Sequence, residues 1–87
     1  MSYSVIFKKC QELTGFSPLE YFRRIRIKKA AILLVSYNYT VSEAAFEVGF
    51  TDSRYFSRLF KEMLGNTPSV FKSQMKEDNL DNFLQQF

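Results

Sequence analysis

The chain has 87 residues, 46% hydrophobic and 24% charged, a composition typical of one small folded domain. It contains no histidine and one cysteine, Cys10, so the usual general base and an internal disulfide framework are excluded. No apolar run reaches the ~20 residues that a membrane span needs, and the first residues lack a signal-peptide pattern. These features predict a cytoplasmic domain that is not an enzyme, holds no cofactor or metal, and makes no membrane contact through this segment.

The net charge of +3 is unevenly distributed along the chain. All twelve lysines and arginines lie at or before Lys76 with six of the nine acids, so residues 1–76 carry a net +6. Residues 77–87 contain three acids and no cation, a net −3. A basic body suits a polyanionic partner, although many solvated helical surfaces have a similar charge.

Apolar residues recur at helical spacing almost throughout, which predicts an all-α domain. The first predicted helix covers residues 4–14, where Ile6, Cys10 and Leu13 share one face. Gly15 follows as the usual left-handed stop of a helix.

The second predicted helix is the longest and ends near Ser36. Ser17 is its expected N-cap and Pro18 its first residue, a pair that is favoured at helix starts. Its apolar residues, from Leu19 to Leu34, lie on more than one side, so we expect this helix to connect two sub-cores.

Three shorter predicted helices follow the loop at residues 36–40. Thr40 and Asp52 are the expected N-caps of the first two, and Gly65 is the expected stop of the second. The helices are expected at residues 41–48, at residues 52–64, and over about eight residues from Pro68.

Two parts of the sequence match at a constant offset of 50 residues, which indicates a diverged internal repeat. Each copy is a helix, a glycine stop and a Ser/Thr-Pro start of the next helix. The matched pairs are Lys8/Arg58, Glu12/Glu62, Gly15/Gly65, Ser17/Thr67, Pro18/Pro68 and Tyr21/Phe71. The second copy has a partner helix before it, whereas the partner of the first would begin before residue 1. We therefore expect the chain to be a fragment of a longer domain.

Residues 41–56 have the layout of a helix-turn-helix. Ala44 and Ala45 are small enough for two steeply crossing helices to approach closely, and Gly49 tolerates the positive φ that the turn requires. Val48 and Phe50 flank the turn and are expected to point inward.

The helix after this turn separates into two faces. Phe56, Leu59, Phe60 and Met63 form the expected buried stripe, and the opposite side carries Arg54, Ser57, Arg58 and Lys61. Arginine can bind guanine edges in a bidentate manner, and lysine and serine can contact phosphates or further bases. A cationic outer face is by itself more often only solvated. Its position directly after the Ala-Ala and Gly-Phe turn favours DNA recognition.

At these residues the sequence resembles the C-terminal DNA-binding domain of the AraC/XylS family of bacterial transcription regulators. The first copy is most similar to the output domains of hybrid two-component sensors. The matching strings are Leu13-Thr14-Gly15-Phe16-Ser17-Pro18, Arg24-Ile25-Arg26-Ile27-Lys28-Lys29-Ala30, Val48-Gly49-Phe50, Tyr55-Phe56-Ser57-Arg58-Leu59-Phe60-Lys61 and Gly65-Asn66-Thr67-Pro68.

The resemblance implies two helix-turn-helix subdomains joined by a linker helix, in a transcription activator that binds two successive major grooves of double-stranded DNA. RNA polymerase and a second copy of the chain are further candidate partners. In this chain the resemblance implies a first-subdomain remnant at 1–16, the linker helix at 17–36, a complete second helix-turn-helix at 37–76 and a tail at 77–87. The expected DNA-contacting residues are Ser4, Lys8, Thr51, Ser53, Arg54, Ser57, Arg58 and Lys61.

Two alternatives stay open at this point. Leu80, Phe83, Leu84 and Phe87 form a helical stripe, so the tail is either an amphipathic helix that covers apolar surface or a frayed end. The chain could also be a helical protein–protein interaction module with a basic face. Such a module would tolerate Arg58→Lys, whereas bidentate base recognition would not.

Overall fold

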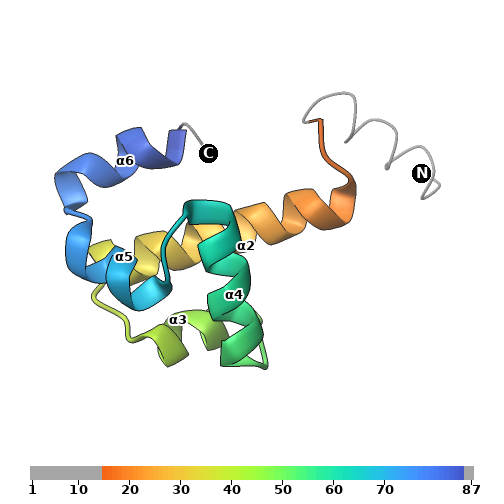
Figure 1. Ribbon diagram of the computed structural model, residues 1–87, viewed down its shortest axis with the longest axis horizontal. Helices are drawn as coiled ribbons and strands as arrows, with labels where there is room; N and C mark the ends of the chain where they lie inside the picture. Colours follow the sequence, from red (N-terminus) through yellow and green to blue (C-terminus); the bar gives the residue numbers. More distant parts are fainter. Residues whose placement is uncertain (1–14, 86–87) are drawn as a thin grey trace.

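The computed structural model describes residues 15–85 of the chain. The first predicted helix, and with it Ser4 and Lys8, lies outside the described residues. All regular secondary structure in the described part is helical, which confirms the predicted fold class (Figure 1). The helices are α2 (Pro18–Ser36), α3 (Val41–Glu47), α4 (Ser53–Leu64), α5 (Pro68–Gln74) and α6 (Glu77–Gln85).

Helices α2, α3 and α4 begin at the residues that the capping signals predicted. The Ser17 hydroxyl accepts a hydrogen bond from the Glu20 backbone N–H at 3.3 Å, with Pro18 in the first turn. Asp52 Oδ1 accepts from the Arg54 N–H at 2.9 Å, and Gly65 closes α4 with a φ of 90°. These contacts satisfy backbone groups that a helix end leaves without a partner inside the helix.

The start of α3 is a complete capping box. The Glu43 N–H donates to Thr40 Oγ1 at 3.1 Å, and the Thr40 N–H donates to Glu43 Oε1 at 3.0 Å. The hydrogen bond from the Thr40 backbone, followed by the contact with its side chain, holds the pKa of the Glu43 carboxyl below its ordinary value. The ionised carboxylate is therefore the form that fixes this end of α3.

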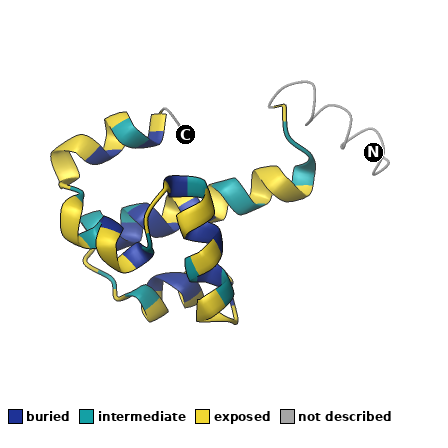
Figure 2. Cartoon of the chain, in the orientation of Figure 1, coloured by how far each residue is buried: buried dark blue, intermediate teal, exposed yellow. Residues whose placement is uncertain are grey.

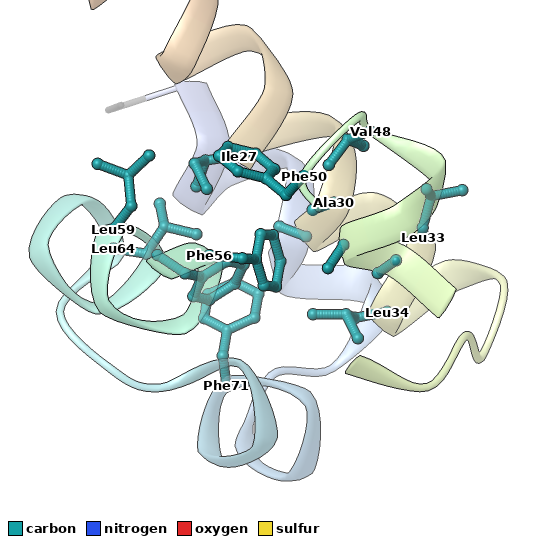
Figure 3. Packing of buried hydrophobic residues seen from close by; sticks show 14 of the residues in the cluster. Ile27, Ala30, Leu33, Leu34, Val48, Phe50, Phe56, Leu59, Leu64 and Phe71 are labelled. Carbon is teal, nitrogen blue, oxygen red and sulfur yellow. The ribbon is translucent and has the colours of Figure 1, made fainter. Parts of the chain in front are cut away.

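The core is built around the C-terminal half of α2, which contacts each of the other four described helices. Ile27, Ala30 and Leu34 are fully buried there. A chain of phenylalanine rings crosses the core from the turn after α3 to α6, with neighbouring centroids 5.3 to 5.8 Å apart. In order, these rings belong to Phe50, Phe56, Phe60, Phe71 and Phe83. Figure 3 shows three of them, Phe50, Phe56 and Phe71, among the buried residues.

The N-terminal half of α2 extends beyond the other described helices (Figures 1 and 2). Leu19 and Phe22 are both 60% exposed and Ile25 is 45% exposed, while the buried residues of this helix begin at Ile27. The sub-core at the second half of α2 is thus present, because α3 to α6 pack there. The other expected sub-core would involve residues 1–14, which lie outside the described residues.

The acidic tail forms α6 and packs on the body. Leu80 and Leu84 are buried, and the Phe83 ring lies edge-on to Phe71 at 5.5 Å. Up to Gln85, this segment is an amphipathic helix that covers apolar surface; Phe87 lies outside the described residues. None of the described helices is both long enough and apolar enough to cross a membrane.

Candidate nucleic-acid interface

The connection between α3 and α4 holds the two helices at a fixed angle. Ala44 and Ala45 are buried, so no bulky side chain separates the helices. Gly49 has a φ of 91°, a conformation that side-chain-bearing residues rarely adopt. Its N–H donates to the Phe46 carbonyl at 3.0 Å, and the Phe50 N–H donates to the Ala45 carbonyl at 2.9 Å. The turn is therefore closed by the backbone of α3 itself.

The inward side of α4 anchors the helix in the core. Phe56, Leu59 and Phe60 are buried as predicted, but Met63 is only partly buried and Leu64 is buried beside the stripe. Val48 and Phe50 are buried too, in agreement with the expectation for the residues that flank the turn. The helix is thus held along its full length, and its opposite side is free to contact a partner.

The outward side of α4 presents three cations. Arg54, Arg58 and Lys61 are all exposed, and within residues 15–85 none of them forms an ion pair. The Arg58 guanidinium lies 6.0 Å from the Tyr55 ring centroid, a distance at which a cation is weakly held over an aromatic face. Ser57, which was expected on the same exposed surface, is half-buried.

Two other expected contact residues lie at the start of α4. Thr51 and Ser53 are exposed and stand on either side of the N-cap Asp52. The structure thus brings six of the eight expected residues onto one end and one side of α4; Ser4 and Lys8 lie outside the described residues.

The placement of the basic residues of α2 was not predicted from the sequence. Arg26 extends toward the turn, where its guanidinium carbon lies 5.8 Å from the Phe50 ring centroid. A Cβ at Gly49 would lie 3.9 Å from the same carbon atom. Arg23, Arg26 and Arg58 line one open cleft of about 600 Å³ between α2 and α4. The density of arginines in α2 was visible in the sequence, but which of them face α4 depends on the angle between the helices.

A second contact that the sequence did not reveal braces the loop before α3. The Lys72 ammonium group on α5 donates to the Tyr39 carbonyl at 2.8 Å, across 33 residues of chain. This lysine therefore stabilises the fold, whereas the cations of α4 are available to a partner.

The arrangement has the chemistry of a surface that binds nucleic acid. An α-helix fits the major groove of B-form DNA, and a guanidinium can donate two hydrogen bonds to the O6 and N7 atoms of guanine. Lysine and the backbone N–H groups at a helix start suit phosphate oxygens.

Comparison with known proteins gives a consistent result. The family described as a helix-turn-helix domain matches residues 1–74. The chain is 34% identical over 77 residues to a protein named Histidine kinase P4 from Formosa agariphila, covering 88% of this chain and 6% of that protein. No solved structure matches.

Other similar proteins have names that describe regulators. The MmsAB operon regulatory protein of Pseudomonas aeruginosa is 35% identical over 65 residues, which are 75% of this chain and 21% of that protein. The HTH-type transcriptional activator RhaS of Escherichia fergusonii is 35% identical over 68 residues, 78% of this chain and 24% of that protein. The chain therefore spans less than a quarter of the length of each of these three relatives.

Proposed function

Because the chain belongs to the AraC/XylS family of helix-turn-helix domains, we propose that it regulates transcription by inserting α4 into the major groove of promoter DNA. The outward side of α4 supports this proposal most directly. Arg54, Arg58 and Lys61 are exposed there and form no ion pair within residues 15–85, on a helix whose other side is fixed in the core. A rigid helix can hold cations in register with base edges.

The roles of the individual side chains follow from their places on α4. Arg54 in the first turn and Arg58 one turn later are the candidates for bidentate contacts with guanine. Ser53 is exposed near the start, where its hydroxyl can contact a base or a phosphate. Ser57 is half-buried, so its hydroxyl can reach only DNA atoms that lie close to the surface of α4. Lys61, near the C-terminal end of α4, is the candidate for a phosphate contact.

The wider biological setting is also a proposal. The similarity to part of a histidine kinase supports an output domain of a two-component system, in which the signal is received by another part of a longer protein. Such a regulator acts in the bacterial cytoplasm, where RNA polymerase is a further partner and a second copy of the domain can occupy an adjacent site.

Fluorescence anisotropy with a labelled mixed-sequence duplex tests DNA binding. The titrations compare the wild-type chain, Arg58→Ala and Lys76→Ala at two salt concentrations. Lys76 is an exposed cation in the α5–α6 connection, so it controls for the loss of one charge. We expect binding that weakens with salt, and a larger loss for Arg58→Ala than for Lys76→Ala. Equal losses in the two variants would contradict a specific role for α4.

A further inference from the structure

The cleft between α2 and α4 combines an apolar floor with cations. Leu19 and Phe22 of α2, and Phe50 and Tyr55 from the other wall, supply the apolar part. Arg23 and Arg26 reach the cleft from α2, and Arg58 reaches it from α4. Because Arg58 also belongs to the outward side of α4, the cleft is continuous with the surface proposed to enter the major groove.

The three arginines of this cleft outnumber the acids near them, which are Asp52 in the cleft and Glu62 beside Arg23 and Arg58. Asp52 is the one acid that lines the cleft, and its Oδ1 accepts the hydrogen bond that caps α4. Within residues 15–85, Arg23, Arg26 and Arg58 form no ion pair. Three guanidinium groups against two carboxylates leave this region with a net positive charge, which favours the binding of an anion.

The position of Arg26 suits a phosphate oxygen. Its guanidinium lies near the Phe50 ring, and the face of an aromatic ring restrains a planar cation without using its N–H donors. The adjacent turn has no side chain at Gly49, so the backbone beside this guanidinium stays accessible to a bulky group. Guanidinium groups bind phosphate in a bidentate manner.

We propose that this cleft binds the sugar-phosphate backbone of the duplex that α4 reads, with Arg23 and Arg26 as phosphate donors. The inference rests on the proposed function, because it extends the α4 surface onto the flanking strand. Deoxyribose offers apolar surface for Leu19 and Phe22, and the phosphates follow at regular spacing. The two arginines thus set the position of the domain on DNA, while the α4 side chains select the sequence.

The test compares two double variants of the 87-residue chain that carry the same net charge. Arg23→Gln/Arg26→Gln removes both proposed donors. Lys28→Gln/Lys29→Gln removes two exposed cations of the same helix that do not line the cleft. Affinity for a labelled mixed-sequence duplex is measured by anisotropy over a range of salt concentrations. The slope of log K against log salt reports the number of phosphate contacts, at about 0.9 per contact for B-form DNA.

The Arg23→Gln/Arg26→Gln variant is expected to reduce the magnitude of the slope by about 1.8. It is also expected to weaken binding equally on duplexes of different sequence. The lysine variant is expected to change the slope much less. Equal slopes in the two double variants would overturn the proposal. The cleft would then be a candidate site for an acidic partner other than DNA. If the wild-type chain itself fails to bind at low salt, the proposed function fails first, and this result is distinct from equal slopes.

One further variant separates the loss of a phosphate contact from a loss of folding stability. Because Arg26 also packs near Phe50, circular dichroism melting is recorded for every variant. If the double variant is destabilised, Arg23→Gln alone is used, since Arg23 lines the cleft and is not stacked on that ring. A slope lower by about 0.9 in the folded Arg23→Gln chain supports the proposal, and an unchanged slope overturns it.

Discussion

Replacing Gly49 by alanine isolates the energetic contribution of the turn between α3 and α4. The residue has a φ of 91°, and an added Cβ would lie 3.9 Å from its nearest neighbour, the guanidinium carbon of Arg26. That distance is an ordinary van der Waals contact, so steric overlap adds nothing to the cost. What is left is the strain of a left-handed backbone on an L-residue, about 1–2 kcal/mol. For a domain of this size the midpoint of thermal unfolding should fall by roughly 4–16 °C.

Gly65→Ala is the matched control, because Gly65 has a φ of 90° and no atom within 4 Å of its added Cβ. Urea denaturation should give the two variants losses that agree within about 0.5 kcal/mol. Gly49→Asn should lose less than Gly49→Ala, since asparagine tolerates this conformation. A loss for Gly49→Ala that exceeds the Gly65→Ala loss by more than about 2 kcal/mol would contradict a cost due to backbone strain alone, because strain at φ cannot supply it. The absence of any loss in both variants would contradict it as well.

Three further predictions concern the core, the cap of α3 and the tail. Phe56→Ala removes a fully buried ring and should cost about 3–5 kcal/mol, so its cooperative thermal transition, followed by circular dichroism, should be largely lost. Thr40→Ala should cost about 1 kcal/mol in urea denaturation. Since the folded-state pKa of Glu43 lies below the ordinary value of 4.5, its contribution is full above that pH and disappears as the pH falls through the lowered pKa. Glu43→Gln should therefore remove part of the acid dependence of the urea midpoint. Leu84→Ala should cost about 2 kcal/mol while Gln85→Ala changes little, and equal losses would contradict the packing of α6.

Features that depend on residues close together in the sequence were predictable from it. Thr40 caps α3 and Asp52 caps α4, because capping involves a hydroxyl or carboxylate and a backbone N–H two or three residues later. The positive φ of Gly49 followed from the shortness of the turn. The outward position of Arg54 and Arg58 followed from helical periodicity once Phe56 and Phe60 were assigned to the core.

Features that depend on how the helices cross were not predictable. The half-buried position of Ser57 and the partial burial of Met63 reflect the width of the contact that α4 makes, which periodicity does not specify. The exposure of Leu19 and Phe22 depends on where along α2 the other helices pack. The Lys72 hydrogen bond to the Tyr39 carbonyl joins residues brought together only by the complete fold.

The placement of Arg26 also depends on how the helices cross, and it enlarges the candidate interface. In the sequence it is one of five basic residues between positions 23 and 29. In the structure it lies near Phe50 and lines the cleft beside α4. The proposed DNA-binding surface therefore includes part of α2 as well as α4.

Selection of bound duplexes from a random pool tests base recognition by α4, with the wild-type chain and Arg58→Lys compared side by side. We expect the wild type to enrich a sequence with guanine at a position where Arg58→Lys shows no base preference. One bidentate arginine contact discriminates between bases by about 1–3 kcal/mol, and lysine cannot reproduce its geometry. If both proteins bind DNA but enrich the same sequence with equal strength, Arg58 contributes only charge, and base recognition through α4 as described is contradicted.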